Sequence, residues 1–189
     1  MFIVFNKEKI YSYVIAFSTV VILFVMANIM VNKDTYSIFT SSTNKLLPIY
    51  SVNTDEKKIA LTMNCAWNAD DIDSILDTLS KNKIHITFFI VGDWAEKFPE
   101  YVKKISDAGH EIANHSYTHP HVNNLKLSEN ADEIEKTSKK IEEITGKATN
   151  IYRTPYGEYN DTVLNAAKEK NHITVQWNLD TLDYTRYNW

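Results

Sequence analysis

Cysteine, proline and glycine are scarce in this chain of 189 residues, which has one cysteine, four prolines and four glycines. A single cysteine, Cys65, excludes an internal disulfide framework and a cysteine-rich zinc knuckle. The few glycines form no glycine-rich phosphate loop. The net charge is −4 and there is no basic stripe, which argues against a nucleic-acid partner. The hydrophobic content of 44% is enough for one domain with a buried core.

Charged residues are also absent from residues 11–32. A stretch of this length can cross a bilayer as one helix, which needs about 20 residues. Lys7 and Lys9 precede it and favour a cytoplasmic N-terminus. Small residues around Ala27 also fit a signal-peptidase site, so cleavage of residues 11–27 is the alternative. We therefore predict that residues 1–32 are a membrane anchor or signal segment. The protein would be a single-pass cell-membrane protein with its domain outside the cytoplasm, or a secreted protein if the segment is cleaved.

The rest of the chain divides into a polar linker, residues 33–56, and a domain, residues 57–189, in which two kinds of apolar pattern alternate. The predicted strands are residues 59–65, 84–91, 110–114, 151–153 and 172–178. The predicted helices are residues 72–79, 99–109, 128–146 and 160–170. This alternation predicts an α/β domain with parallel strands and helices outside them. In such folds reactive groups collect at the carboxyl ends of the strands.

Two histidines, His115 and His119, directly follow the predicted strand 110–114. Imidazoles four residues apart can converge on one metal ion if the backbone turns helically, and neutral imidazole suits zinc. Such a pair alone is more often structural or incidental than ligating. Its place at a strand end, followed by Pro120, favours the metal-binding interpretation.

Three segments carry a resemblance to a known family. Residues 109–119 (GHEIANHSYTH) resemble the metal motif of the polysaccharide deacetylases, the family with the NodB homology domain. Residues 152–157 (YRTPYG) are similar to its Arg-x-Pro-Tyr-Gly motif, and residues 180–184 (DTLDY) resemble an Asp-x-x-Asp-Trp element. The resemblance starts near residue 58 and is closest to the sporulation-associated, membrane-anchored branch. It implies a distorted (β/α) barrel with parallel strands, incomplete because the chain ends at Trp189, after one N-terminal transmembrane helix.

The implied function is metal-dependent N-deacetylation of a cell-wall GlcNAc polymer such as peptidoglycan. In the family a divalent ion, held by two histidines and one aspartate, polarises the acetamide carbonyl and activates water. A second aspartate acts as base beside the motif's arginine, and a C-terminal histidine acts as acid. The resemblance places His115 and His119 at a divalent metal, for which zinc is the expected ion, and pairs Arg153 with Asp180 at the catalytic position. It places Pro155, Tyr156, Gly157 and Tyr184 in the substrate groove.

The first motif departs from the family, because residues 62–65 read TMNC where Thr-Phe-Asp-Asp is expected. Asn64 replaces the base, and an amide cannot take up a proton at neutral pH. Cys65 replaces the third ligand; a thiolate can bind zinc, but a cysteine at a strand end can equally be a small core residue. The Leu-x-His motif that would supply the acid is missing. Two hypotheses stay open: a deacetylase with zinc on His115, His119 and Cys65, and an inactive or truncated relative that binds metal or glycan without turnover.

Overall fold

The computed structural model describes residue 11, residues 15–23 and residues 45–182. Contacts divide the chain into two units, Met1–Asn44 and Lys45–Trp189. In the first unit residues 15–23 are helical, and no helix among the described residues is long and apolar enough to span a membrane. Much of the predicted membrane or signal segment lies outside the described residues, as does Tyr184.

The second unit contains one sheet of five parallel strands in the order β1-β2-β3-β4-β5. The strands are β1 (Thr62–Cys65), β2 (Thr87–Ile90), β3 (Glu111–Asn114), β4 (Ile151–Tyr152) and β5 (Ile173–Thr174). The predicted α/β class with parallel strands is therefore confirmed. The strands follow one another in sequence order, as in a (β/α) barrel, without the reversal of a doubly wound sheet.

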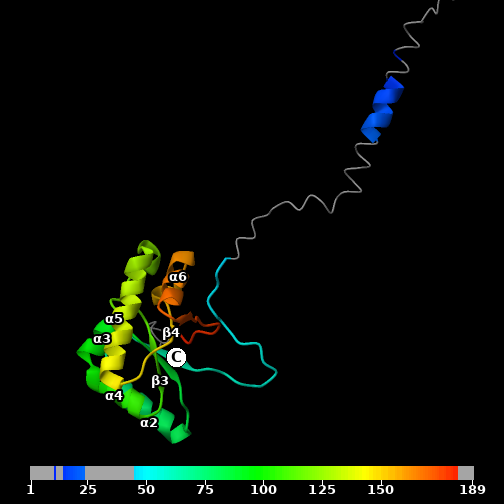
Figure 1. Ribbon diagram of the computed structural model, residues 1–189. Coiled ribbons are helices and arrows are strands. Elements are labelled where there is room, and N and C mark those ends of the chain that lie inside the picture. Colours follow the sequence, from blue (N-terminus) through cyan, green and yellow to red (C-terminus); the bar gives the residue numbers. More distant parts are fainter. Residues whose placement is uncertain (1–10, 12–14, 24–44, 183–189) are drawn as a thin grey trace, which may run out of the picture. The chain divides into compact units, whose positions relative to one another are not determined.

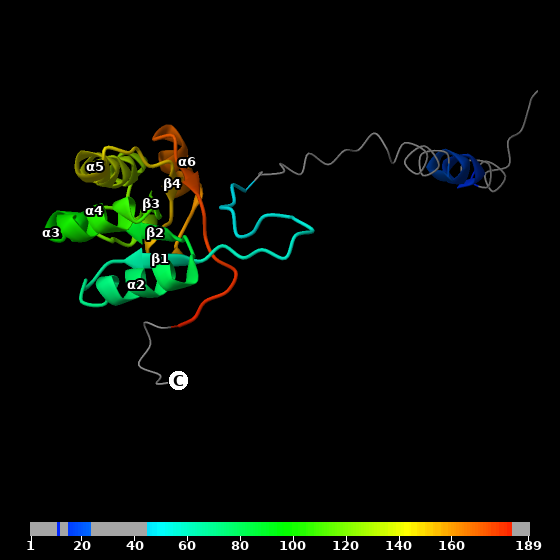
Figure 2. The same cartoon turned by 90° about the horizontal axis from the view of Figure 1, so that it is seen from below.

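Helices connect successive strands and cover one side of the sheet. They are α2 (Ile72–Asn82), α3 (Gly92–Lys97), α4 (Pro99–Asp107), α5 (Leu127–Thr145) and α6 (Asp161–Glu169). Figure 2 shows α2, α4 and α5 following one another in the same order as β1, β2 and β3, and Figure 1 shows α6 beside α5. Pro99 begins α4, where the first turn needs no N–H donor, and the Asn160 side chain caps α6 by accepting from the N–H of Val163 at 3.0 Å.

The apolar core lies between the helices and the sheet. Its largest cluster includes fully buried Phe88 and Ile90 from β2 with Ile72 of α2 and Ile105 of α4. Each such side chain stabilises the fold by about 1.5–3 kcal/mol relative to an exposed one. Side chains of a strand point alternately to its two faces, so the adjacent residues Asn64 and Cys65 of β1 lie on opposite faces. Cys65 packs in this core, and Asn64 is exposed.

Part of the segment predicted to be a linker contacts the sheet. Ile49 forms a parallel bridge with Val175, beyond the end of β5. Its N–H donates to the carbonyl of Thr174 at 2.9 Å, and its carbonyl accepts from the N–H of Gln176 at 2.8 Å. The chain therefore meets the domain before the predicted boundary at residue 57.

Candidate active site

The histidine loop, residues 115–119, follows the carboxyl end of β3. Nδ1 of His115 lies 2.8 Å from the carbonyl oxygen of Arg153. A carbonyl only accepts, so Nδ1 carries the proton and Nε2 keeps its lone pair for a ligand. Burial lowers the pKa of His115 to about 3, so the ring is neutral at physiological pH.

The structure brings His119 beside His115, with ring centroids 5.0 Å apart and the rings nearly perpendicular. The loop reaches this arrangement without a helical turn, which corrects the sequence argument. Ser116 and His119 instead have left-handed backbone conformations, with φ of 69° and 56°. Nδ1 of His119 is buried without a hydrogen-bond partner, and burial lowers the pKa of this ring too. Two neutral imidazoles with free nitrogens suit a borderline divalent ion.

Glu133 of α5 holds the middle of the histidine loop. One carboxylate oxygen accepts from the backbone N–H groups of Tyr117 and Thr118, both at 2.8 Å. The hydroxyl groups of Ser116 and Thr118 donate to the same carboxylate at 3.2 Å. Backbone N–H bonds to a carboxylate are strong, so Glu133 fixes a loop that has no secondary structure of its own.

Two further groups brace the loop from either side. The Asn114 side chain, fully buried, donates to the Ile134 carbonyl at 2.7 Å and accepts from the Ser116 N–H at 2.9 Å. The first N–H groups of α3, from Gly92 and Asp93, donate to loop carbonyls at 2.9 Å. A Cβ at Gly92 would lie 2.2 Å from the Tyr117 ring, so this close approach requires glycine.

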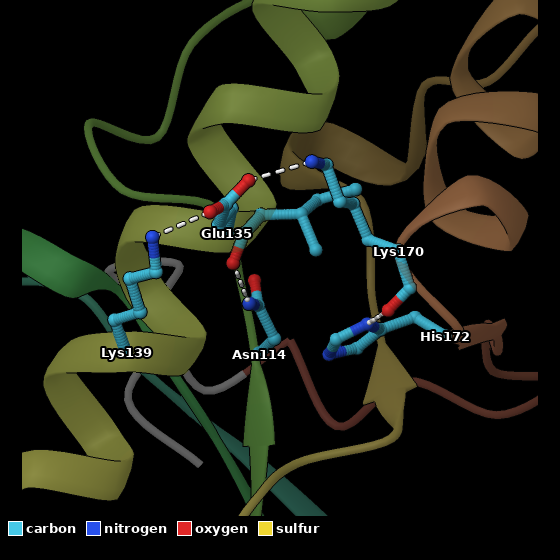
Figure 3. Close-up of polar contacts among 6 residues, drawn as sticks. Asn114, Glu135, Lys139, Lys170 and His172 are labelled. Atoms are coloured by element: carbon cyan, nitrogen blue, oxygen red, sulfur yellow. Dashed lines mark hydrogen bonds and ion pairs between the residues drawn. The ribbon is translucent and has the colours of Figure 1, made fainter.

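Below the loop, a buried polar network continues from β3 to β5. Figure 3 shows Asn114 and His172 beneath α5, with His172 Nδ1 2.7 Å from the Lys170 carbonyl. Ser138 of α5 connects them: it accepts from Asn114 at 2.9 Å, and its hydroxyl lies 3.1 Å from His172 Nε2. On the surface of the same helix Glu135 pairs with Lys139 and Lys170, and these cations hold the pKa of its carboxyl at about 2. The floor of the site is thus tied to α5 and α6.

Arg153, which follows β4, reaches the end of β1. Its Nη1 donates to the side-chain oxygen of Asn64 at 3.0 Å, and its guanidinium lies 3.8 Å from the centroid of the Phe89 ring. Asn64 therefore stands beside the arginine, as the family resemblance implied. Burial lowers the pKa of Arg153 to about 10, which still leaves it charged at neutral pH.

The predicted partner of Arg153, Asp180, does not form an ion pair with it in the described part of the chain. Asp180 is exposed, and its carboxylate accepts from the Leu182 N–H at 2.9 Å. Burial lowers the pKa of Arg153, and the charge of Asp180 acts in the opposite direction as the smaller effect.

Cys65 lies on the core face of β1, 3% exposed, among Ala69, Ile72 and Ile90. This apolar burial raises the pKa of the thiol to about 12, so the thiolate that would bind zinc is disfavoured. Among residues 45–182 no three histidine, cysteine or acidic side chains gather as a metal site. The residues present thus offer two imidazole ligands, and the predicted trio with Cys65 is not assembled.

Aromatic rings surround the histidine pair. Tyr156 is 55% exposed, its ring 4.6 Å from His119 and stacked on His121 at 4.3 Å. Trp67, 72% exposed, lies 5.8 Å from His119. Pro155 is buried. Gly157 has a φ of 68°, and a Cβ at this position would lie 3.0 Å from the Trp177 ring. Exposed rings beside polar groups are suited to contact sugar rings.

Sequence reasoning missed the groups that shape the site from outside the motifs. Glu133 lies within the predicted helix 128–146, where nothing in the pattern marks it as a contact of the histidine loop. The ring of His121 stacks on Tyr156, and its Nδ1 lies 2.8 Å from Glu158. The sequence carries no local signal for these contacts, because each joins residues that are distant in sequence.

Comparisons with known proteins agree with these motifs. The family model described as polysaccharide deacetylase matches residues 51–175. A peptidoglycan-N-acetylglucosamine deacetylase of Bacillus cereus is 37% identical over 130 residues, which are 69% of this chain and 47% of the relative. A peptidoglycan-N-acetylmuramic acid deacetylase of Bacillus subtilis is 34% identical, over 71% of this chain and 52% of the relative. The chain thus spans about half the length of these curated relatives.

A solved structure described as a CE4 family pseudoenzyme from Bacillus anthracis is 35% identical, with a TM-score of 0.72 over 75% of this chain and 50% of that one. A mutant of that pseudoenzyme is described as having restored enzymatic activity. With the family model covering most of the folded unit, and with the histidine pair and Arg153 assembled at the strand ends, the chain belongs to the polysaccharide deacetylase family.

Proposed function

We propose that this chain is a cell-wall glycan-binding member of the polysaccharide deacetylase family that hydrolyses acetylated glycan very slowly or not at all. One observation carries the proposal: Arg153 bonds to an amide, Asn64, at the position where the family has its base. A positioned base contributes about 10²- to 10⁴-fold to such a reaction, and Asn64 cannot take up a proton. The burial of Cys65 in the core, away from the role of third ligand, supports the same conclusion.

Glycan binding is supported by what this chain retains. Tyr156 and Trp67 expose large rings beside His119, and two relatives are described as peptidoglycan deacetylases. The ligand we propose is therefore peptidoglycan or a related GlcNAc polymer. N-deacetylation remains the second candidate, because His115, His119 and Arg153 are all in place.

The test measures binding and turnover separately. Wild type, Asn64→Asp and His115→Ala are incubated with peptidoglycan and with GlcNAc oligomers, and both sedimented protein and released acetate are quantified. We expect wild type to bind peptidoglycan and release almost no acetate, and Asn64→Asp to release more. Trp67→Ala should weaken binding, since stacking rings contribute to it. Robust acetate release by wild type would contradict the proposal and require another group to act as base.

A zinc-like ion on His115 and His119 is a further part of the proposal. Two imidazoles fit such an ion, and bound metal would supply a Lewis acid for the acetamide carbonyl. With only two protein ligands gathered, we expect weak binding, weakened at least about 10-fold further by His119→Ala. Equal metal content in wild type and His119→Ala would contradict the site.

The topology is also proposed from the sequence. An anchor or signal in residues 1–32 would place the domain outside the cytoplasm, where cell-wall glycan is found. Protease added to intact cells should then digest the domain, and complete protection would contradict this topology.

A further inference from the structure

Arg153 is a buried cation that forms no ion pair with any carboxylate of residues 45–182. Its side chain is 4% exposed, and its Nε is buried without a hydrogen-bond partner. Its Nη1 bonds to the neutral amide of Asn64, and its Nη2 makes a long contact of 3.5 Å to the Gln176 carbonyl. Within residues 45–182 no carboxylate lies in ion-pair range of the guanidinium. A buried charge in this state is unfavourable, because the water it has lost is not replaced by an opposite charge.

The surrounding groups do not neutralise this charge. The ring beneath the guanidinium, Phe89, offers only its π face. His115 is held neutral by burial, and burial acts on His119 in the same direction. Asp180 attracts Arg153 from a distance while its carboxylate is exposed and bonded to the Leu182 N–H. No group within residues 45–182 therefore forms an ion pair that balances the charge of Arg153.

The orientation of Asn64 adds donors to this charge. A guanidinium can only donate, so the Asn64 oxygen must face Arg153 and the Asn64 amino group must point elsewhere. Asn64 is exposed, so this amino group is accessible to a ligand from solvent. An aspartate here would present oxygen atoms only. The asparagine thus removes a negative charge and supplies N–H donors at the same position.

We infer that Arg153 and Asn64 form an anion site that binds a small carboxylate without any metal ion. The planar guanidinium matches the geometry of a carboxylate, and a ligand carboxylate would supply the counter-charge that Asn64 lacks. Two sources share this chemistry: free acetate and the lactyl carboxylate of muramic acid residues that carry no stem peptide. The site needs neither turnover nor the histidine pair, so it goes beyond the proposed function.

The first test titrates acetate into the full chain in chelator and at low salt, which limits screening, with binding followed by calorimetry and NMR. We expect wild type to saturate with a dissociation constant on the order of millimolar. Asn64→Asp places a carboxylate on Arg153 and should weaken acetate binding at least about 10-fold, the loss of one charge-assisted contact. Asn64→Asp avoids the truncation of Arg153, which could unfold the domain.

The matched control is Asn150→Asp. It makes the same change in net charge, and Asn150 is exposed just before β4, at the edge of the sheet opposite the site. It should bind acetate as wild type does. Asp180→Asn removes the competing carboxylate and should tighten binding. Binding to wild type only when metal is present, or equal binding by wild type and Asn64→Asp, would overturn the inference.

The second test compares ligand sources. N-acetylmuramic acid that binds more tightly than acetate, in a manner sensitive to Asn64→Asp, would identify a glycan-borne carboxylate, and tighter acetate binding would identify the free anion. Both results support the anion site. If muramic acid and N-acetylglucosamine bind equally and acetate displaces neither, the inference fails. Binding of N-acetylglucosamine oligomers would still report on the proposed glycan function, so the two failures are distinguishable.

Discussion

The histidine loop and the end of β1 lie on neighbouring parts of one site, yet they are built in opposite ways. The histidine loop is held by hydrogen bonds: Glu133, Asn114 and the first N–H groups of α3 bind its backbone at 2.8–2.9 Å. The end of β1 has an amide in place of a base, and Cys65 packs into the core. Hydrogen bonds thus fix the histidine loop, whereas the end of β1 is defined by the amide of Asn64 and by the packing of Cys65 in the core.

This difference shows what each part depends on. The histidine loop is held by hydrogen bonds from α3 and α5, so its geometry does not require a bound ligand. At the end of β1 the environment of each side chain depends on the face of the strand to which it points. The small, weakly polar side chain of Cys65 is accommodated in the core. Substitutions that exchange the properties of the two regions test this contrast.

The largest effect is expected for Cys65→Asp. A carboxylate placed among Ala69, Ile72 and Ile90 would lack a partner, and an unpaired buried charge costs roughly 3–5 kcal/mol. The free energy of unfolding in urea should fall by that amount, whereas Cys65→Ala should lower it by about 1 kcal/mol. A loss below about 1 kcal/mol for the aspartate, or its reversal by zinc, would mean that position 65 faces the histidine pair.

Glu133→Ala should have the next largest effect. It leaves the N–H groups of Tyr117 and Thr118 without their acceptor, so we expect a loss of about 2–4 kcal/mol in unfolding free energy. Amide hydrogen exchange at these two positions should accelerate first. Glu143→Ala, on the exposed face of the same helix, should change stability by no more than about 0.5 kcal/mol. Equal losses in the two variants would refute the role of Glu133.

Much of the fold follows from the sequence because periodicity reports directly on burial. Alternation of strand and helix patterns predicted parallel strands, and the predicted helices 99–109 and 160–170 begin within one residue of the starts of α4 and α6. Helix α3 was missed, because six residues contain too few turns to show a period. Strand ends were predicted too long, since apolar residues such as Ile59 continue beyond the ladder.

The site was only partly predictable for a different reason. The motifs that contain His115, His119 and Arg153 identified the correct strand ends, and the structure brings these three residues together. The side that Cys65 takes, by contrast, depends on the pleat of a four-residue strand and on the core beside it. Glu133 contacts the loop from 15 to 17 residues away, a tertiary contact that local pattern does not encode.

Asn64→Asp should stabilise the chain, in contrast to the two losses above. The new carboxylate would give the buried guanidinium of Arg153 its missing counter-charge, and a charge-assisted hydrogen bond contributes about 1.5–3 kcal/mol. Urea unfolding at pH 7 should show a gain of about 1–3 kcal/mol, with no gain for Asn150→Asp. A destabilised Asn64→Asp variant would show that Asp180 or solvent already neutralises Arg153.

The smallest effect concerns the floor beneath the histidine loop and its dependence on pH. Burial lowers the folded pKa of His172, which lies among the Ser138 and Thr149 hydroxyls and the Lys170 carbonyl. Below about pH 6.5 the unfolded chain therefore binds a proton at His172 that the folded chain does not bind. The contribution of His172 to the free energy of unfolding is full above the unfolded pKa of about 6.5 and falls as the pH drops below it. The free energy of unfolding can change by at most about 1.4 kcal/mol per pH unit for one titrating group.

Between pH 7 and 5.5, wild type should lose about 1 kcal/mol more than His172→Asn, whose amide does not titrate and can keep part of the network. Other buried histidines remain in both proteins, so their contributions cancel in the difference. Parallel pH profiles would show that His172 can take up a proton within the fold, and that the floor is more hydrated than its burial indicates.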